Sequence, residues 1–423
     1  MLTLKVINDN TEEVIKKLAK KHFDGKDIIS KVIEEDRKRK DLQKELDGML
    51  AEINAKSKSI GALMKEGKKE EAENIRRFVQ DIKGDVQTVE ANLKQAESHL
   101  QDMLVQIPNL PSDEVPEGKT AEDNVVEKTG GEIPDLGENP LPHWDLAKKY
   151  DLIDFELGVK ISGAGFPIYK GKGARLQRAL INYFLDKARD AGYMEVQPPY
   201  VVNYASGYGT GNLPDKEGQM YHVTADDLYL IPTAEVPVTN IYRDMILEEK
   251  DLPIRNTAYS ACFRREAGSY GKDVRGLNRL HQFDKVEIVR IDKPEHSYES
   301  LKEMVGYVES LVAELGLPWR ILRLCGGDMS FTSALTFDFE VYSAAQKRWL
   351  EVSSVSNFES YQANRLKCRY RDVDRKIQLA HTLNGSALAL PRIVAALLEN
   401  NQQEDGIRMP DVLVPYLGFD KID

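Results

Sequence analysis

Two stretches, Phe263-Arg-Arg-Glu266 and Arg279-Leu-His-Gln-Phe-Asp-Lys-Val-Glu287, decide how this chain of 423 residues folds and what it can bind. Residues 285–291 alternate between polar and apolar side chains, which is typical of a half-buried strand. The loop between the two stretches contains Gly268, Gly271 and Gly276. We therefore expect two strands joined by this loop, with two arginines, an aromatic ring and two carboxylates on one face of a sheet.

These side chains suit a phosphate group and a base. Arginine binds phosphate oxygens through two parallel hydrogen bonds, and a phenyl ring such as that of Phe283 stacks on a base. A single arginine is more often part of a surface ion pair. The combination of Arg-x-Glu with Arg-x-x-x-Phe-x-x-x-Glu is improbable by chance and favours a binding site. We interpret His281 as a turn or packing residue rather than a general base.

A third stretch, Thr382-Leu-Asn-Gly-Ser386 followed by Pro391-Arg392, predicts a strand that meets a helix. Proline suits the first turn of a helix because it has no N–H to leave unpaired. Arg392 would stand in that first turn, where the free N–H groups also favour an anionic phosphate. Residues 191–202 form a weaker signal, a helix and then a strand that ends at Pro198-Pro199.

Further alternating segments lie at 193–197, 336–342 and 349–354, and helical segments at 174–191, 297–315 and 391–400. Their spacing predicts an α+β domain with a largely antiparallel sheet.

The N-terminal quarter has a different pattern. Its apolar residues repeat every 3.5 positions on average, which keeps one narrow stripe facing a partner helix. Gly67 can turn the chain between the two runs. We predict an antiparallel helical hairpin whose first helix runs from about Asp27 to Lys65. The stripe consists of Leu46, Met49, Ile53, Ile60, Leu63, Ile75, Val79, Ile82, Val86, Val89, Leu93, Ala96, Leu100 and Met103, with Lys56 at the one skipped position.

Basic residues cluster beside this stripe, at 37–40 and 76–77. A solvated coiled-coil face is one interpretation, and a face that follows a phosphate backbone is the other. After the hairpin, residues 107–142 contain six prolines among glycines and acidic residues, which predicts a linker.

The bulk composition excludes several classes of protein. A net charge of −11 argues against a general nucleic-acid coat, and no apolar run is long enough to span a bilayer. We see no secretion signal. The three cysteines, Cys262, Cys325 and Cys368, lie far apart without metal-ligand spacing, so we expect reduced thiols and a cytoplasmic protein.

The stretches at 191–202, 263–287 and 382–398 resemble motifs 1, 2 and 3 of class II aminoacyl-tRNA synthetases, in the expected order. With Thr233-Ala-Glu235, Glu351-Val-Ser-Ser354 and the heptad hairpin, the resemblance to bacterial-type seryl-tRNA synthetases extends over essentially the whole chain. It implies a tRNA-binding domain at 1–108 with a coiled-coil arm, a linker at 109–142, and a class II catalytic domain at 143–423. Pro391 and Ala387 depart from the usual third motif, and Ala387 is expected to narrow the floor of the pocket slightly.

The resemblance also implies roles for single residues. Arg264 would bridge the serine carboxylate and the α-phosphate of ATP, and Arg264 and Arg392 would be the catalytic residues. The implied ATP-binding residues are Arg264, Arg265, Glu266, Arg279, Phe283, Glu351, Val352, Ser353, Ser354 and Arg392. Those for serine are Thr233, Ala234, Glu235, Arg264, Glu287, Asn384 and Ser386, although a structural role for Glu235 and Asn384 is an equal alternative. Glu351 and Ser354 would ligate Mg²⁺.

The implied activity is a serine–tRNA ligase that forms seryl-adenylate from serine and ATP and transfers the seryl group to tRNA(Ser), with tRNA(Sec) as a further candidate. The arm would hold the tRNA through some of Arg37, Arg39, Arg76 and Arg77, and a homodimer is expected. One alternative is an enzyme that passes an aminoacyl-adenylate to a carrier protein, although such enzymes commonly lack the arm. Another is an RNA-binding coiled-coil protein with an inactive catalytic domain.

Overall fold

The structure is a computed structural model, and it describes residues 1–266 and 275–423. Gly268 and Gly271 of the predicted loop lie outside the described residues. The chain divides into two compact units, Met1–Pro108 and Asn109–Asp423. Each unit is described by itself below.

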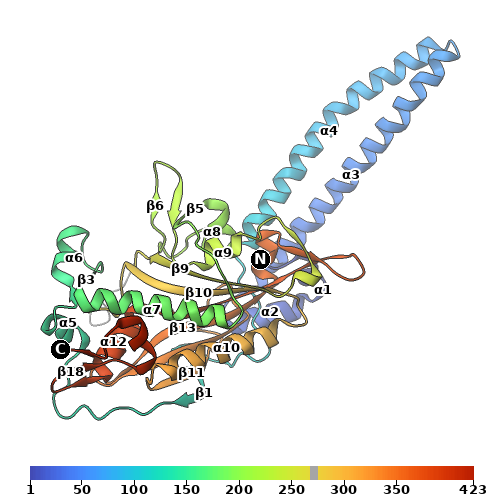
Figure 1. The fold of residues 1–423 in the computed structure, drawn as a ribbon. Coiled ribbons are helices and arrows are strands. Elements are labelled where there is room, and N and C mark those ends of the chain that lie inside the picture. Colours follow the sequence, from blue (N-terminus) through green and yellow to red (C-terminus); the bar gives the residue numbers. More distant parts are fainter. Residues whose placement is uncertain (267–274) are drawn as a thin grey trace. The chain divides into compact units, whose positions relative to one another are not determined.

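The first unit is helical. It contains α1 (Leu4–Asp9), α2 (Thr11–Lys20), α3 (Lys26–Lys65) and α4 (Lys69–Leu104). The two long helices α3 and α4 run antiparallel as a hairpin, drawn in blue in Figure 1. Gly67 turns the chain between them with φ +80°, a conformation that disfavours residues with a Cβ. The predicted hairpin is confirmed, and α3 begins one residue earlier than expected.

The predicted apolar stripe joins the two helices of the hairpin. Leu46, Val86, Val89 and Leu93 form a buried cluster, and Ala96 and Leu100 continue the stripe along α4. At the skipped position, the ammonium group of Lys56 lies 4.2 Å from the centroid of the Phe78 ring. A lysine is tolerated there because its charge faces an aromatic ring rather than an apolar side chain.

The second unit is built on an eight-stranded sheet with the order β1-β11-β12-β13-β16-β10-β9-β4. All neighbours are antiparallel except the edge strand β4, which pairs parallel to β9. The predicted antiparallel sheet is therefore confirmed, with one parallel edge. In this order the strands are Val125–Gly130, Trp319–Arg323, Leu335–Ser343, Arg348–Glu359, His381–Ala389, Gln282–Asp292, Ile254–Phe263 and Met194–Glu195.

Three helices cover one face of this sheet: α7 (Gly171–Asp190), α10 (Ser297–Glu314) and α12 (Leu390–Asn400) (Figure 1). Val286 and Ile288 of β10 pack into the core that these helices form with the sheet. Because side chains alternate along a strand, Phe283, Lys285 and Glu287 point to the opposite face. That face is the one on which the predicted binding residues lie.

The remaining elements surround this framework. The helices are α5 (His143–Lys149), α6 (Phe155–Ile161), α8 (Tyr204–Thr210), α9 (Glu235–Asn240), α11 (Ser360–Leu366) and α13 (Val414–Leu417), with 3₁₀ turns η1 (Ala121–Asp123), η2 (Glu249–Asp251) and η4 (Asp411–Leu413). The short strands are β2 (Ile153–Asp154), β3 (Ile168–Tyr169), β5 (Val201–Asn203), β6 (His222–Val223), β7 (Leu228–Leu230), β8 (Ile246–Glu248), β14 (Arg369–Arg371), β15 (Ile377–Leu379), β17 (Gln402–Gln403), β18 (Gly406–Arg408) and β19 (Lys421–Ile422). Within the described parts of the chain, no helix has both the length and the apolar character needed to span a membrane.

The prediction of a linker at 109–142 is wrong for much of that segment. Strand β1 pairs with β11 and forms an edge of the main sheet. The Asn109 side-chain amide donates to the carbonyls of Thr332 and Phe358 at 2.9 and 2.8 Å. A segment rich in proline and charged residues lacks the regular spacing of apolar side chains that indicates a strand. Main-chain hydrogen bonds to a neighbouring strand can form without that spacing.

Candidate active site

Strand β10 carries a row of three functional side chains on the face away from the helices. Phe283, Lys285 and Glu287 lie two residues apart, or roughly 7 Å per step along a strand. Glu287 lies directly opposite Ala258 on β9 and Ser386 on β16. The row therefore runs along β10, which has β9 on one side and β16 on the other.

A buried polar cluster surrounds the end of this row. The Lys285 ammonium group donates to the Thr233 hydroxyl at 2.9 Å and forms an ion pair with Glu287. Thr233 donates to one carboxylate oxygen of Glu287 at 3.2 Å, and the Asn384 amide donates to the other at 3.1 Å. Burial raises the pKa of Glu287, and the neighbouring Lys285 opposes this effect.

Glu235 is a second carboxyl beside Glu287. It accepts a hydrogen bond of 2.6 Å from the Gln362 amide, and the Gln362 carbonyl oxygen accepts one of 2.7 Å from Thr382. Burial and then repulsion by Glu287 raise the pKa of Glu235 to about 7. Two carboxyls that share the charge of a single lysine, which is paired with Glu287, form a site that favours one additional cation, such as an ammonium group.

Arg264 stands at the end of β9, above the same row. Its guanidinium carbon lies 5.2 Å from the centroid of the Phe283 ring, and its Nε donates to the Pro232 carbonyl at 3.4 Å. Its charge lowers the pKa of Glu287, so it is electrostatically coupled to the buried cluster. An arginine in this position can bind an anion held between Phe283 and Glu287.

His281 has packing contacts, in agreement with the prediction. Its ring stacks on Phe166 with centroids 5.4 Å apart, and its Nδ1 lies 3.0 Å from the Tyr221 hydroxyl and 3.1 Å from the Arg264 carbonyl. These contacts connect the residues on either side of the loop between β9 and β10.

Two of the predicted nucleotide ligands bind each other. Glu266 and Arg279 form an ion pair, with Glu266 largely shielded and in a left-handed backbone conformation at φ +49°. Arg265 is exposed, and its main-chain N–H donates to the Gln219 carbonyl at 2.8 Å. Contact of Glu266 or Arg279 with a nucleotide would replace this ion pair.

A β-bulge places Glu351 and Ser354 on one face of β13. Residues three apart on a regular strand face opposite sides, but here Glu351 lies opposite Glu340 while Ser353 lies opposite Phe339, so Val352 is an extra residue. Val352 belongs to the hydrophobic core, and the buried Ser353 hydroxyl donates to the Ser386 carbonyl at 2.6 Å. The side chains of these two residues therefore point away from Glu351.

A third carboxyl, Asp338, lies opposite Ser354 on β12. Burial and then the negative charge of Glu351 raise the pKa of Asp338 well above its ordinary value. Among the described residues, no group of three or more His, Cys, Asp or Glu side chains is arranged to hold a metal ion. Glu351 and Ser354 nevertheless fit a magnesium ion that takes its other ligands from phosphate and water, because oxygen ligands suit that ion and its charge would relieve this repulsion.

Arg392 lies beside Glu351, in the first turn of α12 together with Pro391, as predicted. Its Nη1 donates to the Glu351 carbonyl at 2.7 Å, and its Nε donates to the Asn278 carbonyl at 3.0 Å. The guanidinium group thus bridges β13 and the segment just before β10.

The two implied alanines lie on opposite faces of the sheet. Ala234 packs in a small apolar cluster with Val238 and Val289, and Val289 continues the face of β10 that carries Glu287. Ala387 lies in the main hydrophobic core. The expectation that Ala387 narrows the floor of a pocket is therefore wrong, since neighbouring residues on a strand point to opposite faces.

In the first unit, the four predicted tRNA-contacting arginines differ in their surroundings. Arg39 donates to the buried Asp36 carboxylate at 3.0 Å, which gives it a structural partner. Arg37 and Arg77 are exposed, and Arg76 makes only a loose, exposed pair with Glu73 at 3.5 Å.

Sequence reasoning missed two members of the buried cluster. Lys285 lies in the same alternating row as Phe283 and Glu287, so the period of two could have identified it. Gln362 lies on α11, far from every motif, and only the fold brings it to Glu235.

Comparison with known proteins finds relatives that match this chain over its whole length. Residues 1–111 match the family described as the seryl-tRNA synthetase N-terminal domain, and residues 221–401 match the tRNA synthetase class II core domain (G, H, P, S and T). A serine–tRNA ligase from Salinibacter ruber is 51% identical, covering 100% of this chain and 99% of the relative. One from Akkermansia muciniphila is 46% identical with the same coverage. The crystal structure of seryl-tRNA synthetase from Pyrococcus horikoshii complexed with ATP aligns with a TM-score of 0.92 at 33% identity, covering 100% of this chain and 99% of that one.

The raised pKa of Glu235 predicts a pH-dependent stability. A carboxyl with a pKa of about 7 in the folded protein and about 4.5 in the unfolded chain holds its proton more tightly when folded. Its contribution to the free energy of unfolding is therefore greatest below pH 4.5 and is lost as the pH rises to 7. Glu235→Gln should remove this loss. The free energy of unfolding of the variant should therefore increase relative to that of the original protein by up to about 2 kcal/mol as the pH rises from 5 to 8. Urea unfolding at both pH values measures the gain, and an equal difference at both would contradict the assignment.

Proposed function

The chain belongs to the seryl-tRNA synthetase family and is an aminoacyl-tRNA ligase that joins serine to tRNA with the use of ATP, and we propose a role in that reaction for each side chain of the site. The observation that carries the proposal is the row on β10, where an aromatic ring, a lysine and a buried carboxylate follow one another with Arg264 above them. The ring suits a base, Arg264 suits a phosphate, and the buried carboxylate suits an ammonium group.

Serine binds at the buried end of the row. Glu287 and Glu235 bind the ammonium group, because two carboxyls that share the charge of one lysine favour one more cation. Thr233, Asn384 and Ser386 lie around Glu287 and supply hydrogen-bonding groups for the serine hydroxyl. A site built to hydrogen-bond a hydroxyl rejects alanine by about 10⁴-fold, since its buried polar groups would otherwise be left unpaired.

ATP binds at the other end of the row. Adenine stacks on Phe283, and its amino group donates to Glu266 once the ion pair with Arg279 opens. Arg279 and Arg392 then bind the terminal phosphates. Arg265, which is exposed, also lines the nucleotide, and Val352 and Ser353 do so through their main chain because their side chains are buried. Glu351 and Ser354 would hold Mg²⁺, which supplies positive charge against the phosphate oxygens.

Adenylate formation needs no side-chain base, because the serine carboxylate is already a nucleophile. Its attack on the α-phosphorus breaks the bond to the bridging oxygen and releases pyrophosphate, which requires that two anions be brought in line and their repulsion cancelled. Arg264 is the residue placed to do this, since it lies between the serine end and the adenine end of the row. The 3′ hydroxyl of the tRNA then attacks the seryl carbonyl, and AMP leaves.

The finer partners are also part of the proposal. The domain at 1–108 binds tRNA(Ser), and tRNA(Sec) is a second candidate. The active form is a homodimer, since motif 1 of class II enzymes commonly packs across a two-fold axis. The cytoplasm is the proposed compartment, supported by three buried cysteines that are all free thiols.

We predict that pyrophosphate exchange into ATP depends on serine and falls at least about 10³-fold in Arg264→Ala. The lost guanidinium leaves the repulsion between carboxylate and α-phosphate uncancelled. Arg189→Ala is the control, since it removes an exposed arginine from α7 and should keep full exchange. Exchange with another amino acid, and none with serine, would overturn the specificity.

We further predict that the triple substitution R37A/R76A/R77A weakens tRNA binding about 10-fold or more. Each lost phosphate contact should also lower the slope of log Kd against log salt by about one. Serine-dependent pyrophosphate exchange serves as the internal control and should not change, because the reaction does not involve tRNA. Unchanged tRNA affinity would show that these exposed arginines belong to a merely solvated coiled-coil face.

A further inference from the structure

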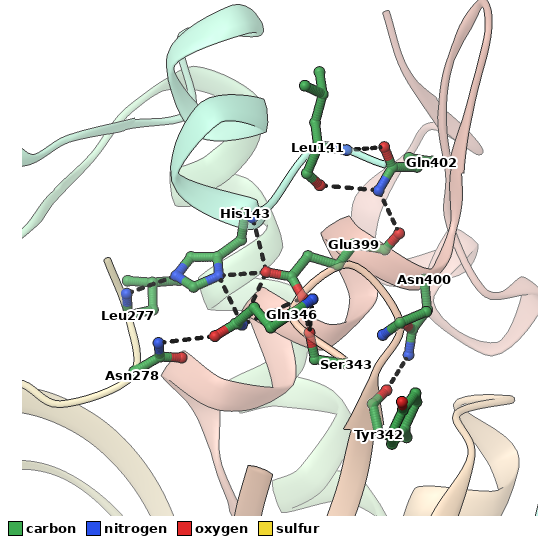
Figure 2. A network of polar contacts seen from close by, with 11 residues as sticks. Leu141, His143, Leu277, Asn278, Tyr342, Ser343, Gln346, Glu399, Asn400 and Gln402 are labelled. Atoms are coloured by element: carbon green, nitrogen blue, oxygen red, sulfur yellow. Dashed lines mark hydrogen bonds and ion pairs between the residues drawn. The ribbon is translucent and has the colours of Figure 1, made fainter. Parts of the chain in front are cut away.

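A buried histidine at the start of α5 lies at the centre of a polar network behind the nucleotide-binding residues. His143 is completely buried, and Figure 2 shows it between Glu399 at the end of α12 and Leu277, just before β10. Its Nδ1 lies 2.6 Å from Glu399, and its Nε2 lies 2.8 Å from the Leu277 main-chain nitrogen. These three residues are more than 100 positions apart in the sequence.

The hydrogen-bonding partners fix the tautomer of His143. A main-chain N–H can only donate, so Nε2 of His143 must accept from Leu277 and cannot carry a proton. The proton is therefore on Nδ1, which donates to Glu399. Glu399 also accepts from the main-chain N–H of His143 and from the side chains of Ser343 and Gln346.

A second branch of the network reaches Arg392. The side chain of Gln346 contacts Glu399 at 3.0 Å and accepts from the Asn278 amide at 3.0 Å. The main-chain carbonyl of Asn278 accepts a hydrogen bond of 3.0 Å from Nε of Arg392. Both branches thus end on residues 277–278, directly before Arg279, and one continues to the arginine at the start of α12.

The same segment approaches His143 closely from the other side. Gly276 has φ +64°, and a Cβ built there would lie 2.2 Å from Nε2 of His143. The Arg275 guanidinium lies 4.5 Å from the centroid of the Trp144 ring. Residues 275–278 therefore pack on residues 143–144 through a cation–π contact, a close glycine contact and a hydrogen bond.

We propose that His143 and Glu399 are positioning residues for ATP: they fix the main chain at 277–278 and thereby orient Arg279 and Arg392. Neither His143 nor Glu399 touches substrate. The inference rests on the proposed binding of terminal phosphates by Arg279 and Arg392. Glu399 and Arg392 occupy opposite ends of α12, so one helix carries both the anchor of the network and the group that it orients.

Two substitutions at position 143 separate positioning from mere packing. In His143→Asn the amide nitrogen can replace Nδ1 as a donor to Glu399, but the acceptor for the Leu277 N–H is lost. In His143→Gln the longer side chain can carry its carbonyl oxygen to the place of Nε2, which keeps that acceptor and loses the donor. Both variants lose one hydrogen bond of the buried pair, so similar falls in Tm are expected.

Steady-state pyrophosphate exchange on the full chain then gives the decisive comparison. We expect KM for ATP to rise about 10-fold in His143→Asn and less than about 3-fold in His143→Gln, with KM for serine within about 2-fold in both. A purely structural role predicts that KM for ATP changes equally in the two variants, in proportion to their fall in Tm. That result, or an unchanged KM for ATP in His143→Asn, would overturn the proposal.

A third variant approaches the contact from the loop, in case the histidine variants do not fold. Gly276→Ala pushes residues 276–278 away from His143 and leaves the pair with Glu399 intact, so it should also raise KM for ATP and not KM for serine. Gly137→Ala is the matched control, because Gly137 has φ +72° with nothing within 4 Å of an added Cβ. Equal KM values for ATP in these two glycine variants would count against the inference.

Arg392→Ala distinguishes failure of the inference from failure of the proposed function. If KM for ATP rises in Arg392→Ala but not in His143→Asn, the phosphate role stands and the positioning role falls. If Arg392→Ala leaves KM for ATP unchanged, the assignment of the arginine itself is wrong.

Discussion

Strand β10 has to satisfy opposite demands on its two faces. Val286 and Ile288 pack against the helices, while Lys285 and Glu287, each one position away along the strand, are polar side chains that are also buried. A slip of the strand by one residue would exchange the two sets of side chains, placing charges in the core and apolar groups at the site. The register of β10 with β9 and β16 is therefore the constraint on which both the fold and the chemistry depend.

Burial of Glu287, Lys285 and Glu235 has an energetic consequence. Transfer of such groups from water is unfavourable, and it is offset only where each polar atom finds a partner. Thr233, Asn384 and Gln362 provide those partners, and they come from three separate parts of the chain. The cluster is thus held in place before any ligand arrives, which reduces the reorganisation that binding and reaction require.

Much of this arrangement could be predicted from the sequence, because local periodicity carries it. The alternation of residues 285–291 predicted β10, the heptads predicted the hairpin, and Pro391 predicted the start of α12. Other features could not be predicted, because they depend on pairing between distant residues. The bulge at Val352 appears only in the register of β12 and β13, and nothing near residue 143 indicates a contact with residue 399. The prediction of a linker at 109–142 is wrong for the same reason, since β1 is held by main-chain bonds to β11.

The proposed function requires the row on β10 to bring ATP and serine together along one sheet face. A crystal structure of the chain with a non-hydrolysable seryl-adenylate analogue tests this most directly. We expect adenine to stack on Phe283, the serine ammonium group to lie within hydrogen-bonding distance of Glu287, and Arg264 to contact the group replacing the phosphate. An analogue bound with its serine end away from Glu287, or with its adenine ring elsewhere than Phe283, would contradict it.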